Sequence, residues 1–189
     1  MKISYLYNKA RAQRGFTLIE LLIVLGIIAV LAIIGLPAVQ NIAIEGRAPE
    51  VAKAVQSSII KLTNNRSSGG TWTGAATAEL ASVLTGNTTL KVVTGATPSV
   101  AHDLNRSGAT GSITLAAGNL AAAGDAGLIT ISEIDGVACP ILANALAKVS
   151  STMKINTTDV KTVAAPEYKG GDAQTACKDN QNVVAIQFR

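Results

Sequence analysis

The longest hydrophobic stretch of the chain covers residues 21–39 and holds no charged side chain over 19 positions. A helix of that length spans about 28 Å, close to the hydrocarbon thickness of a bilayer. One acid, Glu20, directly precedes this stretch, although the apolar character already begins at Phe16. The pattern therefore predicts a membrane-spanning helix that carries a single carboxylate near its start.

Beyond residue 50 the pattern changes to that of an amphipathic helix. Apolar or small residues recur with the spacing i, i+3, i+4, i+7, at Val51, Ala54, Val55, Ser58, Ile59 and Leu62. We therefore predict one long helix over 16–64, whose second half packs on a soluble domain. Gly46 and Pro49 favour a bend within it, and the run NNRSSGG at 64–70 predicts its end.

Shorter patterns in the rest of the chain predict helices mixed with strands. Helices are predicted at 75–86 and 139–149, and β-branched or alternating runs predict strands at 89–93, 112–117, 128–134 and 183–188. Stretches rich in Gly, Ser and Thr near 64–74 and 105–119 predict loops. The predicted fold class is α+β, with an antiparallel sheet laid across the exposed half of the long helix.

Positive charge is concentrated at the N-terminus. Four of the 16 Lys and Arg precede the apolar stretch, namely Lys2, Lys9, Arg11 and Arg14, and the 12 that remain equal the 12 Asp and Glu. A basic start before an apolar run is typical of a secretory signal peptide or of a single membrane anchor with its N-terminus in the cytoplasm. The run is too long for a signal peptide and lacks a clean cleavage site, and an anchor leaves Glu20 and the Gly15-Phe16 junction unexplained.

The run RGFTLIELLIVLGIIAVLAIIGLP, residues 14–37, closely resembles the type IV prepilin signature. That signature is a basic leader ending in Gly, then Phe-Thr-Leu-Ile-Glu, then an apolar helix containing Pro. The resemblance implies that a prepilin peptidase cuts between Gly15 and Phe16 and methylates the new N-terminus. It also implies a ladle-shaped subunit with a cleaved leader at 1–15, a long helix at 16–64 whose part 16–39 is transmembrane and later filament core, and a globular domain at 65–189.

The resemblance gives Glu20 a role in assembly. A carboxylate in a spanning segment costs about 2.5–3.5 kcal/mol at the membrane centre and less near its edge. In the family, this Glu neutralises the N-terminal amine of a neighbouring subunit, here the amine of Phe16. The alternative is a Glu20 that merely lies in the headgroup region. Gly35 and Pro37 predict a helix kink, which in the family is a point that can unwind when helices pack.

The two cysteines, Cys139 and Cys177, lack the C-x-x-C spacing of metal or redox motifs. In an exported chain we expect one disulfide, which closes a loop of about 39 residues and stabilises by about 4 kcal/mol. The alternative is two buried free thiols. The 15-residue leader and the sequences around both cysteines resemble type IVb pilins, in which the disulfide bounds a large region, here 139–177. A Phe at the mature N-terminus is instead the type IVa habit.

The sequence offers no catalytic, metal or cofactor motif. His102 is the only histidine and is interpreted as a solvated loop residue. Residues 103–114 mimic an EF-hand loop, but Thr114 stands where calcium needs a bidentate Glu. Trp72 is interpreted as a partly buried anchor for the loop after the long helix. We expect no enzyme, metal or cofactor, and the neutral mature chain gives no support to nucleic-acid binding.

The expected function is that of a structural subunit of an extracellular type IV pilus, serving adhesion, aggregation, motility, conjugation or DNA uptake. The expected partners are other copies of the chain in a helical homopolymer, the prepilin peptidase, the pilus assembly platform, minor pilins and the inner membrane. The expected location is the bacterial inner membrane, single-pass with the N-terminus inside, and then the pilus. The alternatives are a minor pilin, a type II secretion pseudopilin and a membrane-anchored enzyme.

Overall fold

The structure, a computed structural model, describes residues 15–66, 71–106, 108, 110–178 and 180–189. The predicted leader at 1–15 lies outside the described residues except for Gly15. The chain divides into two compact units, Met1–Val39 and Gln40–Arg189.

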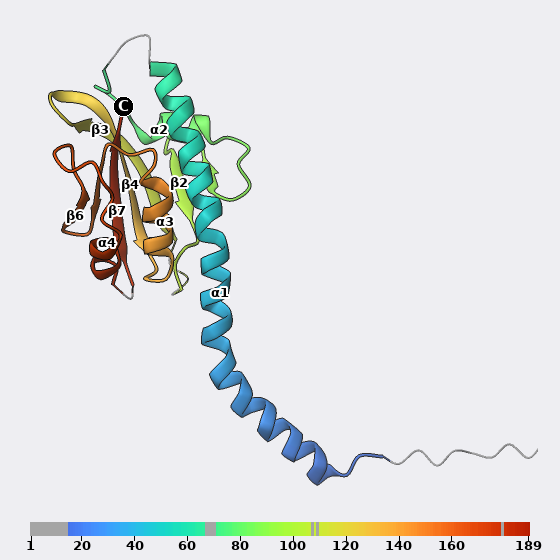
Figure 1. The fold of residues 1–189 in the computed structure, drawn as a ribbon. Helices are drawn as coiled ribbons and strands as arrows, with labels where there is room; N and C mark the ends of the chain where they lie inside the picture. Colours follow the sequence, from blue (N-terminus) through green and yellow to red (C-terminus); the bar gives the residue numbers. More distant parts are fainter. Residues whose placement is uncertain (1–14, 67–70, 107, 109, 179) are drawn as a thin grey trace, which may run out of the picture. The chain divides into compact units, whose positions relative to one another are not determined.

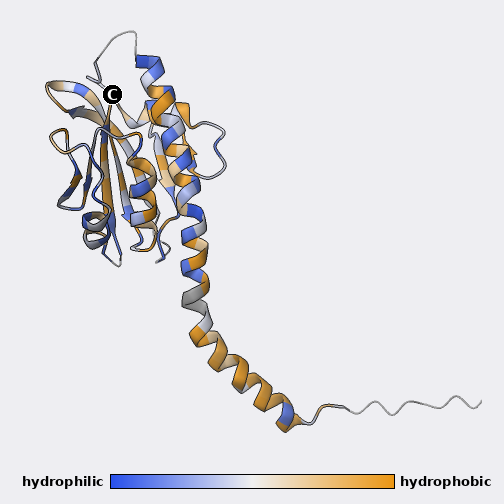
Figure 2. Ribbon diagram, viewed as in Figure 1, coloured by the Kyte–Doolittle hydropathy of each residue, from blue (hydrophilic) through white to orange (hydrophobic). Residues whose placement is uncertain are grey.

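Helix α1, Leu18–Arg66, belongs to both units and has 49 residues. Its apolar first half is not covered by the protein: the large apolar side chains from Phe16 to Ile34 are 44–82% exposed. By length and composition this helix could cross a membrane, and Figure 2 shows that its hydrophobic residues concentrate in the first half. Exposed apolar area of this extent requires lipid or another protein to cover it.

The second unit is built on one antiparallel sheet. Its strands follow the order β1-β2-β3-β4-β7-β5-β6 among the described residues. The strands are β1 Lys91–Val93, β2 Ser99–His102, β3 Gly111–Asn119, β4 Ala123–Ile134, β5 Thr152–Ile155, β6 Thr158–Lys161 and β7 Asn182–Phe188. The shorter helices are α2 Thr77–Val83, α3 Ala138–Leu146 and α4 Gly170–Ala176 (Figure 1). This α+β architecture is the predicted fold class.

The last strand of the chain lies inside the sheet. β7 pairs with β4 on one side and β5 on the other, both antiparallel. Its residues alternate strictly between buried and half-buried, and the pairing places Ile186 beside Ile129 of β4 on the core-facing side. A strand that satisfies backbone groups on both edges is tied to the whole sheet.

The second half of α1 supplies one wall of the hydrophobic core. The six positions of the predicted amphipathic stripe are all buried, at Val51, Ala54, Val55, Ser58, Ile59 and Leu62. The five apolar members join the core-facing side chains of β4 and β7 in one cluster. The predicted helix face is therefore confirmed. Ser58, the polar member, donates its hydroxyl hydrogen bond to the carbonyl of Val55 at 2.7 Å, which makes its burial tolerable.

Trp72 lies shortly after α1 and is buried, more deeply than the partly buried anchor that was predicted. Its ring is 4% exposed and meets the Phe188 ring edge to face, with 4.9 Å between centroids. The guanidinium of Arg66, the last residue of α1, lies 5.2 Å from the Trp72 ring centroid and also pairs with Glu79 of α2. Gly127 of β4 leaves room for both rings, because a Cβ there would lie 2.7 Å from Phe188 and 2.8 Å from Trp72.

The predicted helices and four predicted strands are present with shifted ends, but four elements were not predicted. These are β2, β5, β6 and α4. The loop predicted near 105–119 is wrong in its second part, which is β3. Each missed strand has four residues and therefore only two core-facing positions. That is too few to produce a recognisable period in the sequence.

Candidate functional site

The predicted processing junction is an open segment before α1. Gly15 and Phe16 have no regular secondary structure and are exposed, and the Phe16 side chain is 82% exposed. Within the described residues, no atom lies within 4 Å of the place where a Cβ on Gly15 would stand, the two chain neighbours aside. That part of the chain therefore places no steric requirement for glycine at this position.

Glu20 lies in the first turn of α1 and takes part in starting the helix. Its backbone N–H donates to the Thr17 hydroxyl at 3.3 Å, and the Leu21 N–H donates to the Thr17 carbonyl at 3.2 Å. Thr-x-x-Glu is the capping-box pattern, in which Glu or Gln serves at the fourth place. An acidic side chain in the first turn also interacts favourably with the positive end of the helix dipole. Sequence reasoning missed this role of Thr17, although the Thr-x-x-Glu spacing could have revealed it.

The Glu20 carboxylate has no salt-bridge partner within the described part of the chain. Around it lie exposed apolar side chains, among them Ile19 and Ile23. Once the apolar surface is covered by lipid or protein, an unpaired carboxylate in that environment costs several kcal/mol. The arrangement is suited to a positive partner that arrives from another molecule.

Gly35 and Pro37 lie inside α1, which is helical on both sides of them. The side chain of Pro37 is outside the described residues. A proline in a helix interior removes one backbone donor and clashes with the preceding turn. The kink and the unwinding point therefore stay predictions for this segment.

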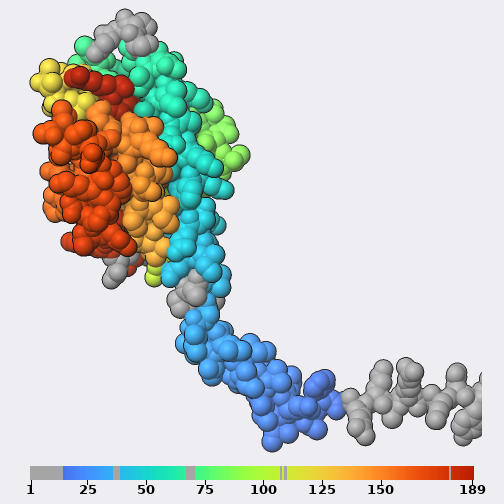
Figure 3. Space-filling model, in the orientation of Figure 1, coloured from blue at the N-terminus to red at the C-terminus, as the bar shows by residue number. Residues whose placement is uncertain are grey.

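A disulfide links Cys139 and Cys177, whose Cα atoms lie 5.9 Å apart. It connects the first turn of α3 to the residue that follows α4. The segment between the two cysteines contains β5 and β6, and Figure 3 shows it as a continuous orange-to-red side of the domain. The alternative of two free thiols is thereby excluded.

Beside the disulfide, buried Asn182 connects four parts of the chain. Its Nδ2 donates to the Ile134 carbonyl at 3.0 Å and to the Lys178 carbonyl at 2.7 Å. Its Oδ1 accepts from the Lys178 N–H and from Nδ2 of Asn156. A fully buried amide is stable only with such partners. Sequence reasoning missed Asn182, since its importance depends on contacts with distant residues.

We expect the double variant Cys139→Ser/Cys177→Ser to lower the free energy of unfolding by about 2–5 kcal/mol. The bond holds α3 beside the start of β7, and without it the unfolded chain gains freedom over 38 residues of sequence separation. Chemical denaturation of the oxidised wild type, the reduced wild type and the variant measures this. The reduced wild type should match the variant, and equal stability of all three proteins would contradict the prediction.

The interpretation of His102 as a solvated loop residue is wrong. His102 ends β2 and is 2% exposed. Its Nε2 lies 2.9 Å from the Ser132 carbonyl, and its Nδ1 accepts from the Leu104 N–H at 3.1 Å. The polar neighbours of His102 in sequence suggested a loop, but pairing of β2 with β3 encloses the ring.

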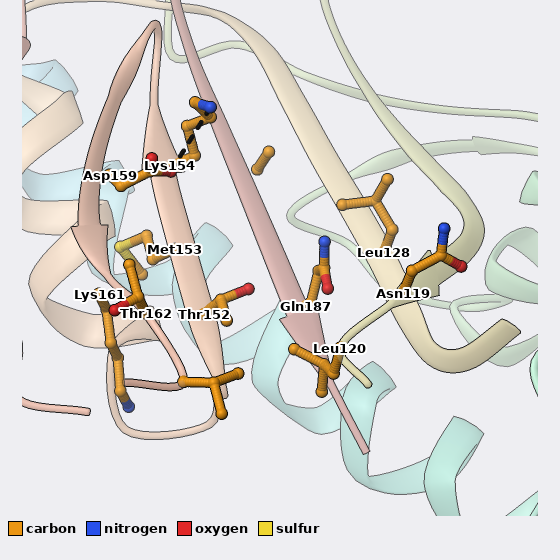
Figure 4. A pocket seen from close by; sticks show the side chains of 12 residues that line it. Asn119, Leu120, Leu128, Thr152, Met153, Lys154, Asp159, Lys161, Thr162 and Gln187 are labelled. Atoms are coloured by element: carbon orange, nitrogen blue, oxygen red, sulfur yellow. Dashed lines mark ion pairs between the residues drawn. The ribbon is translucent and has the colours of Figure 1, made fainter. Parts of the chain in front are cut away.

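The outer face of the sheet carries a hollow of about 290 Å³ above β7. Figure 4 shows it between β5 and β6 on one side and the β3–β4 turn on the other. Its charged residues have partners: Lys154 pairs with Asp159 at 3.5 Å, and Lys161 donates to the Ala147 and Ser150 carbonyls. The hollow offers polar contacts but no unpaired charge of the kind that catalysis uses.

At the edge of this face, Asp125 and Arg189 stabilise the β3–β4 turn. The Asp125 carboxylate accepts from the N–H groups of Leu120, Ala121 and Ala122 and pairs with the Arg189 guanidinium. These bonds, with the Leu120 N–H foremost, hold the pKa of Asp125 below its ordinary value. Asp125 is therefore a structural anion. Within the described ranges no three metal-ligating side chains come together.

Comparisons with known proteins agree with the N-terminal segment and with the fold. Residues 10–36 match the family model for the prokaryotic N-terminal methylation motif. Over 29 residues the chain is 72% identical to prepilin peptidase-dependent protein D of Escherichia coli (strain K12). That alignment covers 15% of this chain and 20% of the relative, so the chain matches about a fifth of the relative's length.

Among solved structures, the chain resembles the crystal structure of a type IVb pilin from Salmonella typhi. The TM-score is 0.51 at 14% sequence identity, and the match covers 71% of this chain and 95% of the other. Identity at this level shows a shared fold. The chain therefore carries a prokaryotic N-terminal methylation motif, and its fold is similar to that of a type IVb pilin.

Proposed function

We propose that the chain is a structural subunit that polymerises into an extracellular type IV pilus after prepilin peptidase cleavage and N-methylation. The observation that carries this proposal is the uncovered apolar half of α1, with large side chains 44–82% exposed. Lipid covers it before assembly, and the same segments of neighbouring copies cover it in the filament. The apolar helix thus serves first as membrane anchor and then as filament core.

Cleavage after Gly15 makes Phe16 the first residue and creates a positive amine there. Glu20 lies four residues further on, at the start of the uncovered helix. A carboxylate and an amine that both lack a partner in an apolar environment attract each other strongly, and the amine of a neighbouring copy can supply the partner of Glu20. In this proposal, pairing of Glu20 with the Phe16 amine of a neighbour sets the register of each incoming subunit.

The proposed route follows from charge and topology. The four positive residues of the leader hold the N-terminus in the cytoplasm, so the domain is exported and its disulfide forms in an oxidising compartment. The partners are the prepilin peptidase, the assembly platform, minor pilins and further copies of this chain. The proposed role is structural and not enzymatic.

We assign the subunit to the type IVb major pilins. The disulfide encloses the large region 139–177 and β7 follows its second cysteine, the arrangement expected for that subclass. The fold is also similar to that of the Salmonella typhi type IVb pilin. A pseudopilin of type II secretion would be expected to carry an acidic calcium loop instead.

Deletion of this chain from its host tests the proposal. We expect electron microscopy to show surface filaments in the parent strain, none in the deletion strain and filaments again after complementation. Antibody against the domain should label the filaments along their whole length. Label at the tips alone would indicate a minor pilin. Loss of protein secretion without loss of filaments would indicate a pseudopilin.

A further inference from the structure

The hydrogen bonds of the buried His102 ring favour one protonation state, the neutral ring. The Ser132 carbonyl can only accept a hydrogen bond, so Nε2, 2.9 Å away, must carry a proton. Nδ1 accepts from the Leu104 N–H at 3.1 Å, so it must be unprotonated. The ring is therefore neutral, and a second proton on Nδ1 would face the Leu104 N–H and break that bond.

The ring also packs closely against β3. Gly111 of β3 pairs directly with His102. A Cβ on Gly111 would lie 2.2 Å from Cε1 and 2.3 Å from Nε2 of the ring. Since Gly111 does not have a positive φ, its lack of a side chain serves to make space for the imidazole. The neutral ring is held by a close-fitting cradle.

The segment that follows His102, residues 102–106, links several elements of the domain; we call it the β2–β3 connection. Asp103 pairs with Arg47 of α1, and the Leu104 carbonyl accepts from the Asp135 N–H at 2.7 Å. Arg106 pairs with the Asp135 carboxylate at 3.2 Å. Any movement at Leu104 is therefore passed to α1 on one side and to the entry of α3 on the other.

We propose that His102 is a proton-operated latch: a second proton on its ring releases Leu104 and draws Asp103 from Arg47 to the imidazolium, which loosens the β2–β3 connection from α1. Two carboxylates are close enough to attract the charged ring, Asp103 within the connection and Glu133 on β4. Arg47 and Arg106 are the cations on the same segment, paired at present with Asp103 and Asp135. Asp103 thus has two alternative partners, and protonation selects between them.

The direction of the response follows from the two states of the ring. Burial lowers the pKa of His102, against the opposing effects of the Ser132 carbonyl, Asp103 and Glu133. In an opened connection the ring regains a pKa of about 6.5. The opened state therefore binds a proton more tightly than the closed state does. Above about pH 6.5 the ring is neutral in both states and the latch is closed. As the pH falls from there toward the lowered pKa of the closed state, the opened state becomes progressively more populated.

Because His102 is the only histidine of the chain, the latch can be followed without ambiguity. The full chain in detergent micelles, purified without a histidine tag, gives one imidazole signal by NMR. Hydrogen exchange of residues 102–106 and of α1 around Arg47 should rise about tenfold between about pH 7.5 and about pH 5.5, after correction for intrinsic rates. The imidazole signal should titrate below its ordinary pKa in the same samples.

Two variants separate the latch from general acid effects. His102→Gln can donate from its amide and accept on its oxygen but does not titrate in this range, so its exchange should be independent of pH in both segments. Asp103→Asn removes the carboxylate that would move from Arg47 to the imidazolium. The pH response of hydrogen exchange should then be lost around Arg47 and kept at residues 102–106. Equal protection of the wild type at both pH values, or the same response in His102→Gln, would overturn the proposal. If His102→Gln does not fold, an imidazole that titrates at or above about 6.5 without any change in exchange would also overturn it.

Discussion

Cells that carry Glu20→Gln should lose surface filaments, although the protein is inserted, processed and folded. The substitution removes the charge that pairs with the Phe16 amine of a neighbouring copy. Gln still fits the fourth position of the capping box with Thr17, so the start of α1 is preserved. The described contact of Glu20 is local, from its N–H to Thr17, and removing a charge makes membrane insertion easier. The loss should therefore be confined to assembly.

Sheared surface filament, normalised to processed protein in the membrane, measures this effect. Glu20→Ala should behave as Glu20→Gln does, since both lack the charge. Glu45→Gln is a matched control, because Glu45 is an exposed acid on the same helix in the second unit. Thr17→Ala removes the cap alone and should reduce the yield only slightly. Wild-type filament yield from Glu20→Gln would refute the pairing role and leave the membrane anchor intact.

Gly15→Val should leave the uncut precursor in the membrane and abolish mature subunit. A peptidase that cuts after Gly15 must approach the backbone closely, which glycine allows and a β-branched side chain obstructs. The structure sharpens this prediction, because a Cβ at Gly15 would meet no atom of the described residues within 4 Å, the two chain neighbours aside. Failure of the variant to be cleaved is then expected to reflect the enzyme and not the fold.

Mass spectrometry of the wild-type protein should find a mature N-terminus at N-methylated Phe16, and of Gly15→Val only the full-length chain. Gly26→Ala serves as control, since Gly26 also has space for a Cβ and lies beyond the cut. It should be cleaved as the wild type is. A wild-type N-terminus at any other residue would contradict the prepilin assignment.

The two substitutions act at successive stages. Gly15→Val stops the chain before the positive amine exists, whereas Glu20→Gln acts after that amine has formed. Processed subunit without filament is therefore expected only for Glu20→Gln. If both variants instead accumulated as precursor, Glu20 would be part of what the peptidase recognises, and its role in subunit pairing would lack support.

The sequence by itself determined those features that depend on neighbouring residues or on the surrounding membrane. The charge-free stretch at 21–39 can be recognised from the sequence because the bilayer interior favours apolar side chains at every position of a spanning helix. The stripe from Val51 to Leu62 can be recognised because apolar residues on one face of a helix recur with a period of 3.6 residues. The motif around Gly15 and Glu20 can be recognised because its residues are contiguous in the sequence. The disulfide followed from there being only two cysteines.

Tertiary structure decided the features that depend on residues far apart in the chain. β5 and β6 have four residues each, too few for a visible period, and β5 exists because it pairs with β7 about thirty positions later. The central place of β7 depends on both β4 and β5. His102 is buried because β3 presents a glycine opposite it, and Asn182 matters because its amide bonds to Ile134, Asn156 and Lys178. Such burial and pairing are properties of the assembled sheet, so no local pattern in the sequence can encode them.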